Sequence, residues 1–175
     1  TWTGEYYLCI PYDYEVDMQD LSKKESLRVC SLDPGVRTFQ TIFDPSNNCA
    51  YEVAPGDMNR IVRLCICLDK LASKRDNAPN AKKKYSYKRA YRRASQRIRN
   101  LIDEVHKQLA KFIATHYDFV MIPKFEVSQM IRKSTRKIKS QSVRQMTNWA
   151  HYRFRQRLIL KCRQFGCKVA VVDES

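Results

Sequence analysis

The sequence predicts an α/β fold in which helices cover a mixed sheet that begins with an antiparallel meander of three strands. Three observations lead to this prediction. Short β-prone runs separated by turn residues come first, two long stretches with apolar residues at helical spacing follow, and further short β-prone runs then alternate with a helix. A meander that continues into βαβ crossovers gives a mixed sheet, because crossover connections join parallel strands.

The meander is the first predicted element. Leu27–Asp33 alternates apolar and polar residues and is ended by Pro34, Phe39–Phe43 follows, and Cys49–Val53 returns after a polar turn. An alternation with a period of two is typical of strands that are buried on one face, and the turn residues between the runs suit hairpin connections.

Two long helices are predicted next. Apolar residues recur at helical spacing from Met58 to Ala72, and a second stripe runs from about Lys82 to His116. Packing the two as an antiparallel hairpin would bury both stripes. The remaining predicted elements are a strand, a helix and a final buried strand, over Asp118–Ile122, about Ser142–Phe165 and Lys168–Val172.

Residues 1–26 precede the meander and are expected to belong to a different region. Tyr6–Ile10 is a short apolar, β-prone run, and a polar, acidic stretch follows it. We therefore expect a strand and a loop that enter from a preceding domain over 1–26, and the main domain over 27–175.

Charge is distributed unevenly along the 175 residues. Residues 1–69 hold 6 basic and 11 acidic side chains, whereas residues 70–175 hold 27 basic and 7 acidic ones. An unrelieved basic face costs stability through repulsion, so it indicates a polyanionic partner. Tyr85, Tyr87 and Tyr91 lie between the basic residues and favour nucleic acid over a membrane as the partner, because their rings can stack on bases. Packing between helices is the alternative role for these tyrosines, and it is the preferred role for Tyr91.

The residues expected to bind nucleic acid lie in two basic blocks. They are Lys82, Lys83, Lys84, Lys88, Arg89, Arg92, Arg93, Arg132, Lys133, Arg136, Lys137, Lys139, Arg153 and Arg155.

Several classes of protein are disfavoured. No run approaches the roughly 20 apolar residues that span a membrane, and no signal peptide is visible. The seven cysteines include no Cys-x-x-Cys pair, which argues against a disulfide framework and against a self-contained zinc site. Cys162 and Cys167 are expected to be packing residues, as is Trp149, whereas His151 is expected to face phosphate or solvent.

Asp33 is the first candidate for chemistry. It ends the first predicted strand and precedes Pro34-Gly35, where a glycine allows a phosphate or metal ion to approach the backbone. A second acid at the end of a neighbouring parallel strand would complete a pair of carboxylates able to hold two Mg²⁺ ions for phosphodiester hydrolysis. An ordinary turn is the alternative reading of the same residues.

Three segments in order resemble one family. Ser31–Phe39 resembles the first RuvC motif of the TnpB nucleases and their Fanzor relatives, Ile122–Met130 resembles the second RuvC segment on the Fanzor side, and Met146–Ser175 resembles the passage into the zinc ribbon. The resemblance implies an RNase-H-like (RuvC) fold with a basic helical hairpin. It also implies an RNA-guided, Mg²⁺-dependent DNA endonuclease with a guide RNA and target DNA as partners, and no small-molecule substrate.

The resemblance places the second acid away from its usual position. In most TnpB proteins an acid directly follows the second apolar run, where this sequence has Pro123. In Fanzor-like relatives the glutamate is relocated towards the later segment, so Glu174 is expected to share Mg²⁺ with Asp33 as a catalytic residue. Glu126 is the runner-up, and Asp173 is expected to face the other way.

The resemblance also implies parts beyond Ser175. A zinc ribbon, which would hold the only Zn²⁺, and a last catalytic Asp are expected there, so the chain would be active only within a longer parent. A Fanzor-like protein would reside in the nucleus, and a prokaryotic TnpB in the cytoplasm. The alternatives are a catalytically degenerate relative that binds nucleic acid, and an unguided RNase-H-like resolvase or transposase.

Overall fold

A computed structural model describes residues 6–13, 25–134 and 137–173. The chain divides into two compact units. The first, which we call the hairpin unit, contains the described residues within 1–14 and 59–103. The second, which we call the sheet unit, contains the described residues within 15–58 and 104–175. Each unit is described by itself.

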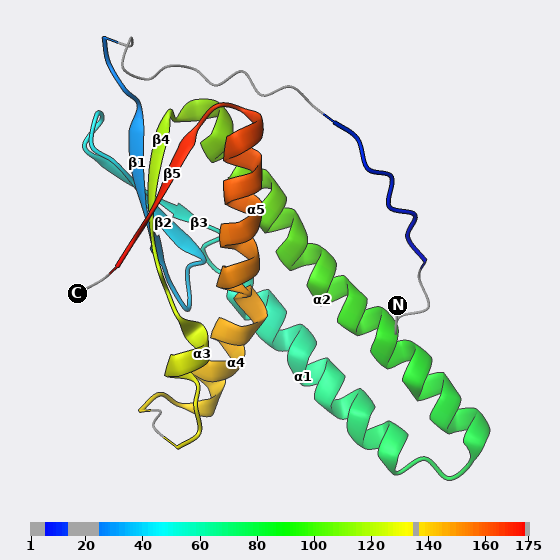
Figure 1. Ribbon diagram of the computed structural model, residues 1–175. Helices are drawn as coiled ribbons and strands as arrows, with labels where there is room; N and C mark the ends of the chain where they lie inside the picture. The colour runs from blue at the N-terminus through cyan, green and yellow to red at the C-terminus, as the bar shows by residue number, and fades with distance from the viewer. Residues whose placement is uncertain (1–5, 14–24, 135–136, 174–175) are drawn as a thin grey trace. The chain divides into compact units, whose positions relative to one another are not determined.

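The sheet unit contains one mixed sheet of five strands in the order β3-β2-β1-β4-β5 (Figure 1). β2 is antiparallel to β1 and to β3, whereas β4 is parallel to β1 and β5 is parallel to β4. This is the strand order of the RNase-H-like RuvC fold, and it confirms the predicted fold class. The strands are β1 Val29–Pro34, β2 Gln40–Asp44, β3 Cys49–Val53, β4 Phe119–Pro123 and β5 Lys168–Val172.

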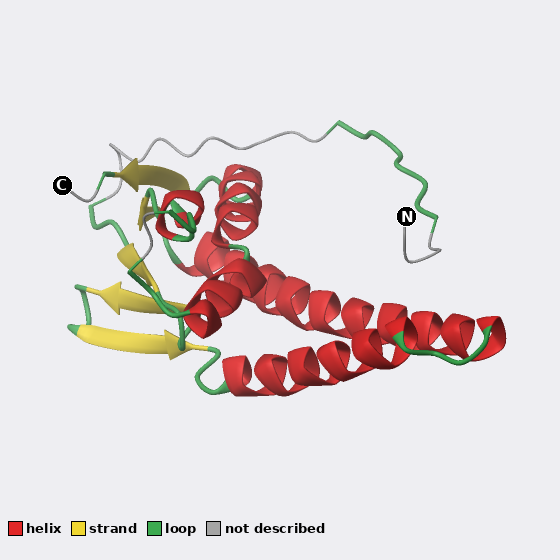
Figure 2. Cartoon of the chain, turned by 90° about the horizontal axis from the view of Figure 1, so that it is seen from below, coloured by secondary structure: helices red, strands yellow, loops and turns green. Residues whose placement is uncertain are grey.

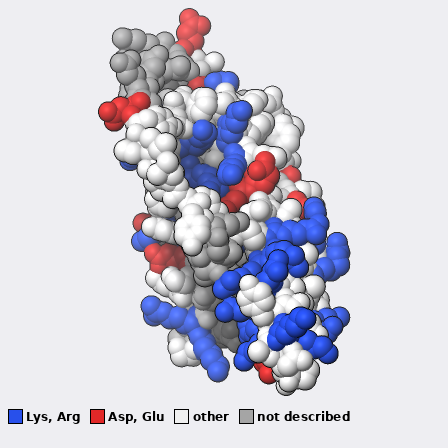
Figure 3. Space-filling model, turned by 90° about the vertical axis from the view of Figure 1, so that its right-hand side faces the viewer, with Lys and Arg blue, Asp and Glu red and all other residues white. Residues whose placement is uncertain are grey.

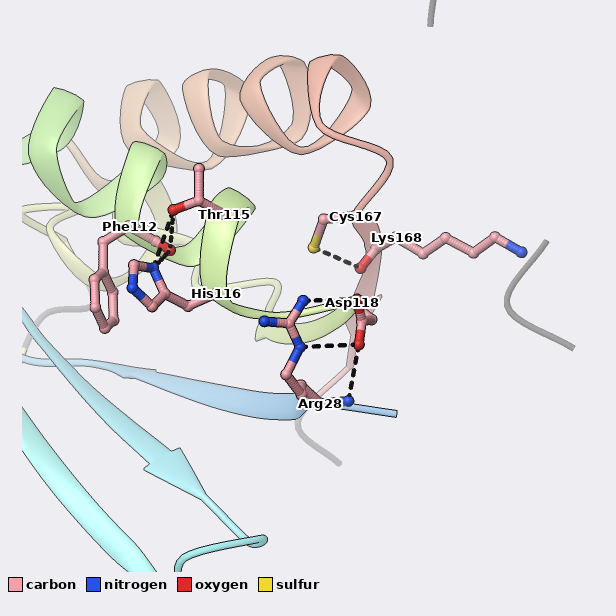
Figure 4. A network of polar contacts seen from close by, with 7 residues as sticks. All are labelled: Arg28, Phe112, Thr115, His116, Asp118, Cys167 and Lys168. Carbon is pink, nitrogen blue, oxygen red and sulfur yellow. Dashed lines mark hydrogen bonds and ion pairs between the residues drawn. The ribbon is translucent and has the colours of Figure 1, made fainter. Parts of the chain in front are cut away.

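An ion pair at the start of the parallel strands fixes their register. The backbone N–H of Arg28 donates to Oδ2 of Asp118 at 3.0 Å, and Nη2 of Arg28 lies 3.1 Å from Oδ1 (Figure 4). The backbone N–H of Asp118 donates to the Arg28 carbonyl at 2.8 Å, and the N–H of Lys168 donates to the Asp118 carbonyl at 2.9 Å. Asp118, directly before β4, therefore joins the residue before β1 and the first residue of β5.

The core of the sheet unit lies on one face of the sheet. Cys30, Leu32, Ile42, Val120 and Ile122 are buried, and they alternate with more exposed neighbours along their strands. Such alternation is expected where helices cover one face of a sheet. The helices of this unit are the end of α2, whose full range is Ala81–His116, with α3 Val127–Met130, α4 Ser140–Trp149 and α5 His151–Gln164.

The predicted single helix over Ser142–Phe165 is wrong, because the structure divides it into α4 and α5. Ala150, between them, has φ 50° and ψ 50°, the left-handed conformation. No glycine or proline marks the break in the sequence. A left-handed alanine costs about 1–2 kcal/mol, so contacts of the neighbouring side chains must compensate for it.

α5 ends in a hydrogen-bonded cap that contains Gly166 and two cysteines. Gly166 has φ 73°, and the N–H of Cys167 donates to the carbonyl of Cys162 at 2.9 Å. This is the hydrogen bond of a Schellman cap, in which the residues at the two ends of the bond pack together. Cys162 and Cys167 are both buried, which confirms them as packing residues.

Two predicted strands differ from expectation. Lys168–Val172 forms β5, but it is an edge strand with no buried residue rather than a buried one. The described residues 6–13 include no strand, and Tyr6–Ile10 is exposed. A strand requires a hydrogen-bonded neighbour, and no described strand pairs with this segment.

The hairpin unit confirms the two predicted long helices. α1 covers Asp57–Asp76, and α2 begins at Ala81 after a short turn, so the two helices run antiparallel and side by side (Figures 1 and 2). Ile61, Cys65 and Leu68 of α1 and Ile98 and Ile102 of α2 are buried. No helix within the described residues combines the length and the apolar character that a bilayer crossing requires.

Candidate active site and nucleic-acid interface

The carboxyl ends of three parallel strands meet at one edge of the sheet. β1 pairs with β4 up to Ser31 and Met121, and two residues further the same register brings Asp33 level with Pro123. Pro123 in turn pairs with Val172 of β5. Asp33 is exposed, whereas Leu32 and Pro34 on either side of it are buried. The strand therefore presents the Asp33 carboxylate on the face opposite the core.

Charged residues follow β4 and β5 at this edge, and with Asp33 we call them the strand-end site: Asp33, Lys124, Glu126 and Asp173. Nζ of Lys124 lies 3.3 Å from Oε1 of Glu126 and 4.0 Å from Oδ1 of Asp173. Gln129 Nε2 donates to the other carboxylate oxygen of Glu126. Lys124 thus neutralises part of the charge of two acids, and both oxygens of Glu126 have partners.

The strand-end site does not contain a complete set of metal ligands among the described residues. No group of three or more His, Cys, Asp or Glu side chains able to hold a metal ion occurs within them. Glu174, the predicted partner of Asp33, lies outside the described residues. The pairing of Asp33 with Glu174 stays a prediction. The carboxylate of Asp33 fits Mg²⁺, because this ion prefers oxygen ligands.

A tight loop follows Asp33 and connects β1 to β2. The N–H of Gly35 donates to the Phe39 carbonyl at 3.2 Å, and the N–H of Phe39 donates to the Val53 carbonyl at 3.2 Å. A Cβ atom on Gly35 would lie 2.5 Å from the carbonyl oxygen of Thr38, so no other residue fits without a shift of the backbone. The sequence singled out this glycine for a ligand, whereas the structure requires it for the loop itself.

The prediction that His151 faces phosphate or solvent is wrong. His151 is 4% exposed, stacks on Phe39 at 5.3 Å between ring centroids, and accepts a hydrogen bond of 3.4 Å at Nδ1 from Gln40 Nε2. The pKa of His151 is lowered to about 4, chiefly by burial and to a smaller extent by the nearby His106, while a hydrogen bond with the Gly35 backbone opposes the shift. His151 is therefore neutral at pH 7 and packs under the loop that follows Asp33.

The first basic block lies on α2 in the hairpin unit. Lys82, Lys83, Lys84, Lys88, Arg89 and Arg93 are exposed, and Arg92 is half-buried. Figure 3 shows Lys and Arg side chains gathered over the hairpin. Tyr85 is 62% exposed, which leaves its ring available for stacking. The Arg75 guanidinium lies 5.5 Å from the centroid of the Tyr91 ring, so Tyr91 packs within the hairpin, as predicted.

The second basic block belongs to the sheet unit. Arg132, Lys133, Lys137 and Lys139 are exposed on the segment between α3 and α4, and Arg136 lies outside the described residues. On α5, Arg153 is exposed, whereas Arg155 is half-buried and its guanidinium lies 5.5 Å from the centroid of the Tyr152 ring. Exposed cations at these positions suit contacts with phosphates, and that role stays a prediction.

A large cavity of the sheet unit lies apart from these residues. It has a volume of about 940 Å³ and is lined by Tyr51, Phe112 and Tyr117 together with the acids Asp44 and Glu52, among others. None of the strand-end residues lines it. Its acidic side chains disfavour a phosphate backbone, so the cavity gives no support to the nucleic-acid interface.

Several residues with structural importance were not singled out from the sequence. Asp118 was interpreted only as the start of a strand, and its contact with Arg28 joins positions 90 residues apart. His106 is completely buried, and its Nε2–H donates to the Trp149 carbonyl at 2.9 Å. The apolar stripe of α2 could have identified the burial of His106, because this residue follows Ile102 at helical spacing.

Several viral proteins resemble this chain in sequence. No protein-family model matches the sequence. Two TnpB-like proteins of Acanthamoeba polyphaga mimivirus are each 24% identical over 178 residues, covering 98% of this chain and 33% of each relative. The chain thus spans about a third of the length of these relatives.

A chain from the cryo-EM structure of the Cas12f1-sgRNA-target DNA complex matches 83% of this chain, at 14% identity and a TM-score of 0.49, over 28% of its own length. The assignment of the fold rests on the strand order in the sheet rather than on this likeness. The resemblance that the three motifs carry is confirmed by the sequence comparison. Over nearly its whole length, therefore, this chain is similar in sequence to TnpB-like proteins, and its strands have a RuvC-like arrangement.

Proposed function

We infer that this chain forms the nuclease core of an RNA-guided, Mg²⁺-dependent DNA endonuclease, and that it acts as part of a longer protein. The observation that supports this function best is the position of Asp33. It is an exposed acid on the central strand β1, beside the parallel strand β4, at the edge where the following segments bring further charged residues. The homology to TnpB-like proteins over 98% of the chain supports the same function.

In this proposal Asp33 and Glu174 hold Mg²⁺ together with an acid from another part of the parent protein. Bound Mg²⁺ would supply an activated water and stabilise the leaving oxygen of the phosphodiester. Glu126 is less suited to this role, because Lys124 and Gln129 already occupy its carboxylate oxygens. The two basic blocks would hold the guide RNA and the target DNA through phosphate contacts, which recognise shape and charge rather than base identity.

The catalytic assignment can be tested with paired variants of the full-length parent. Asp33→Asn should abolish cleavage of a matched DNA target while RNA binding is retained, because the substitution removes one negative charge and leaves the loop intact. Glu104→Gln, which makes the same change at an exposed acid of α2, is the matched control. Cleavage by Asp33→Asn at the wild-type rate would contradict the role of Asp33.

The identity of the second acid requires a separate comparison. Glu174→Gln should be inactive, whereas Glu126→Gln should retain activity. The opposite result would assign the metal to Glu126 and refute the relocation to Glu174.

Guidance by RNA is tested first by purifying the parent from its natural context. A single dominant RNA species that survives a high-salt wash, with one variable end, is the expected result. A random mixture of nucleic acids would contradict guidance and favour unguided DNA chemistry. For a Fanzor-like parent we further propose residence in the nucleus, which imaging of the tagged protein can check.

One observation favours a second candidate function, binding of nucleic acid without cleavage. The position level with Asp33 on β4 is Pro123, which offers no side-chain ligand, and the next residue is the cation Lys124. A parent protein that binds a matched target tightly but does not cut it in Mg²⁺ would support this alternative and exclude the nuclease.

A further inference from the structure

The break between α4 and α5 brings two side chains against the loop that follows Asp33. Trp149 ends α4, His151 begins α5, and the left-handed Ala150 lies between them. The indole Nε1–H of Trp149 donates to the carbonyl of Val36 at 3.0 Å. Val36 is the third residue after Asp33, so this hydrogen bond joins α4 directly to the loop that begins at the candidate ligand.

The other end of the same loop is held by stacked rings. The ring of Phe39 is completely buried, and its centroid lies 4.8 Å from that of Trp149 and 5.0 Å from that of His106. His106 also donates to the Trp149 carbonyl, which fixes the tryptophan backbone. The loop from Gly35 to Phe39 is thus attached to α4 and α2 at both of its ends.

Ordinary packing does not require this arrangement. His106, His151 and Gln40 are all less than 5% exposed, and burial of polar groups is unfavourable unless hydrogen bonds compensate for it. A core made of apolar side chains would fill the same space without that cost. The rings of His106 and His151 both stack on Phe39, which ends the loop, and the hydrogen bond from Trp149 reaches the loop at Val36. Gln40, the residue after the loop, bonds to His151.

We propose that Trp149 is a positioning residue that holds the Gly35–Phe39 loop, and through it the carboxylate of Asp33, in the conformation that binds a divalent cation. The inference rests on the proposed nuclease function, because it assigns Asp33 to a metal site. The hydrogen bond from the indole to Val36 and the ring contact with Phe39 carry this role, and the left-handed Ala150 is the local strain that the contacts offset.

Mn²⁺ is the probe for the test, because it takes the same oxygen ligands as Mg²⁺ and its free form gives a paramagnetic resonance signal. In the full-length parent, Trp149→Phe removes the indole donor and keeps an aromatic ring. We expect Mn²⁺ binding to weaken by about tenfold, the lower end of the effect of residues that orient a ligand. High Mn²⁺ should restore cleavage by Trp149→Phe, whereas Asp33→Asn should not be restored.

A matched control separates positioning from loss of stability. Leu158→Val also removes volume from the core of the sheet unit, where Leu158 is completely buried, but an aliphatic side chain forms neither a hydrogen bond nor a ring contact with the loop. It should lower the temperature of unfolding without changing Mn²⁺ binding. Equal Mn²⁺ affinity in Trp149→Phe and the wild type would overturn the positioning role.

Hydrogen exchange of the wild-type parent gives a second readout that needs no variant. Mg²⁺ should slow exchange of the backbone amides in residues 35–39, because a bound ion stabilises the loop conformation. Unchanged exchange in a parent that cleaves DNA would overturn the inference while leaving the nuclease intact. A parent in which Asp33→Asn alters neither Mn²⁺ binding nor cleavage would instead refute the proposed function, and the inference with it.

Discussion

The buried histidine His151 predicts that the protein loses stability in mild acid. Its pKa is lowered to about 4, chiefly because burial disfavours the charged ring, and its neutral form packs on Phe39. In the unfolded chain the same side chain titrates near 6.5. Between these values the unfolded state binds one more proton than the folded state. Stability therefore falls as the pH decreases from about 6.5 towards about 4.

The magnitude follows from the difference between the two pKa values. A difference of one in pKa corresponds to about 1.4 kcal/mol, so protonation of His151 lowers the free energy of unfolding by roughly 3 kcal/mol in all. About 2 kcal/mol of this loss has already occurred at about pH 5. Small domains are typically stable by only about 5–15 kcal/mol, so a loss of this size is measurable.

Urea unfolding of the wild type and of His151→Phe, each at about pH 7 and about pH 5, isolates this contribution. The phenylalanine keeps a ring against Phe39 but cannot bind a proton. The wild type should lose about 2 kcal/mol more than the variant between the two pH values. Equal pH dependence of the wild type and His151→Phe would refute the burial argument.

Three further predictions follow from other parts of the chain. Replacing Lys82, Lys83 and Lys84 by Ala should weaken nucleic-acid binding, and the slope of log affinity against log salt concentration should decrease in magnitude by about 2–3. Fluorescence anisotropy measures this slope, and an unchanged slope would exclude these lysines from phosphate contact. Asp118→Asn should lower the free energy of unfolding by about 1–2 kcal/mol, because it weakens the contact with Arg28, which is itself largely exposed. Urea unfolding measures this loss. No loss would show that the backbone hydrogen bonds alone set the strand register. Gly35→Ala should lower the free energy of unfolding, measured by thermal unfolding, by about 1–3 kcal/mol, because the added Cβ would lie 2.5 Å from the carbonyl oxygen of Thr38. A variant as stable as the wild type would mean that the loop adapts freely.

The positions of most strands and helices could be predicted from the sequence, because local patterns decide them. The alternation along Leu27–Asp33 and the turn at Pro34 predicted β1, and helical spacing of apolar residues predicted α1 and α2. Short hairpin connections and crossover rules predicted a mixed sheet that begins with an antiparallel meander, and the structure gave the full order of its strands. The uneven charge was likewise a property of composition and needed no structure.

Long-range contacts decided what local patterns could not. The division of α4 from α5 at Ala150 depends on Trp149 and His151, whose partners Val36 and Gln40 lie more than 100 residues away. The same limit applies at the strand-end site, where Lys124 lies 4.0 Å from Asp173 because β5 lies beside β4.

The sequence by itself therefore determined the order of the elements, the basic character of the second half and the candidate acid Asp33. Only the tertiary structure decided that His151 is buried, that Lys124 lies near Asp173, and that Asp118 joins three strands. The physical reason is that hydrogen bonds, ion pairs and burial depend on which segments become neighbours in space, whereas turns and periodicity depend on residues that are close in sequence.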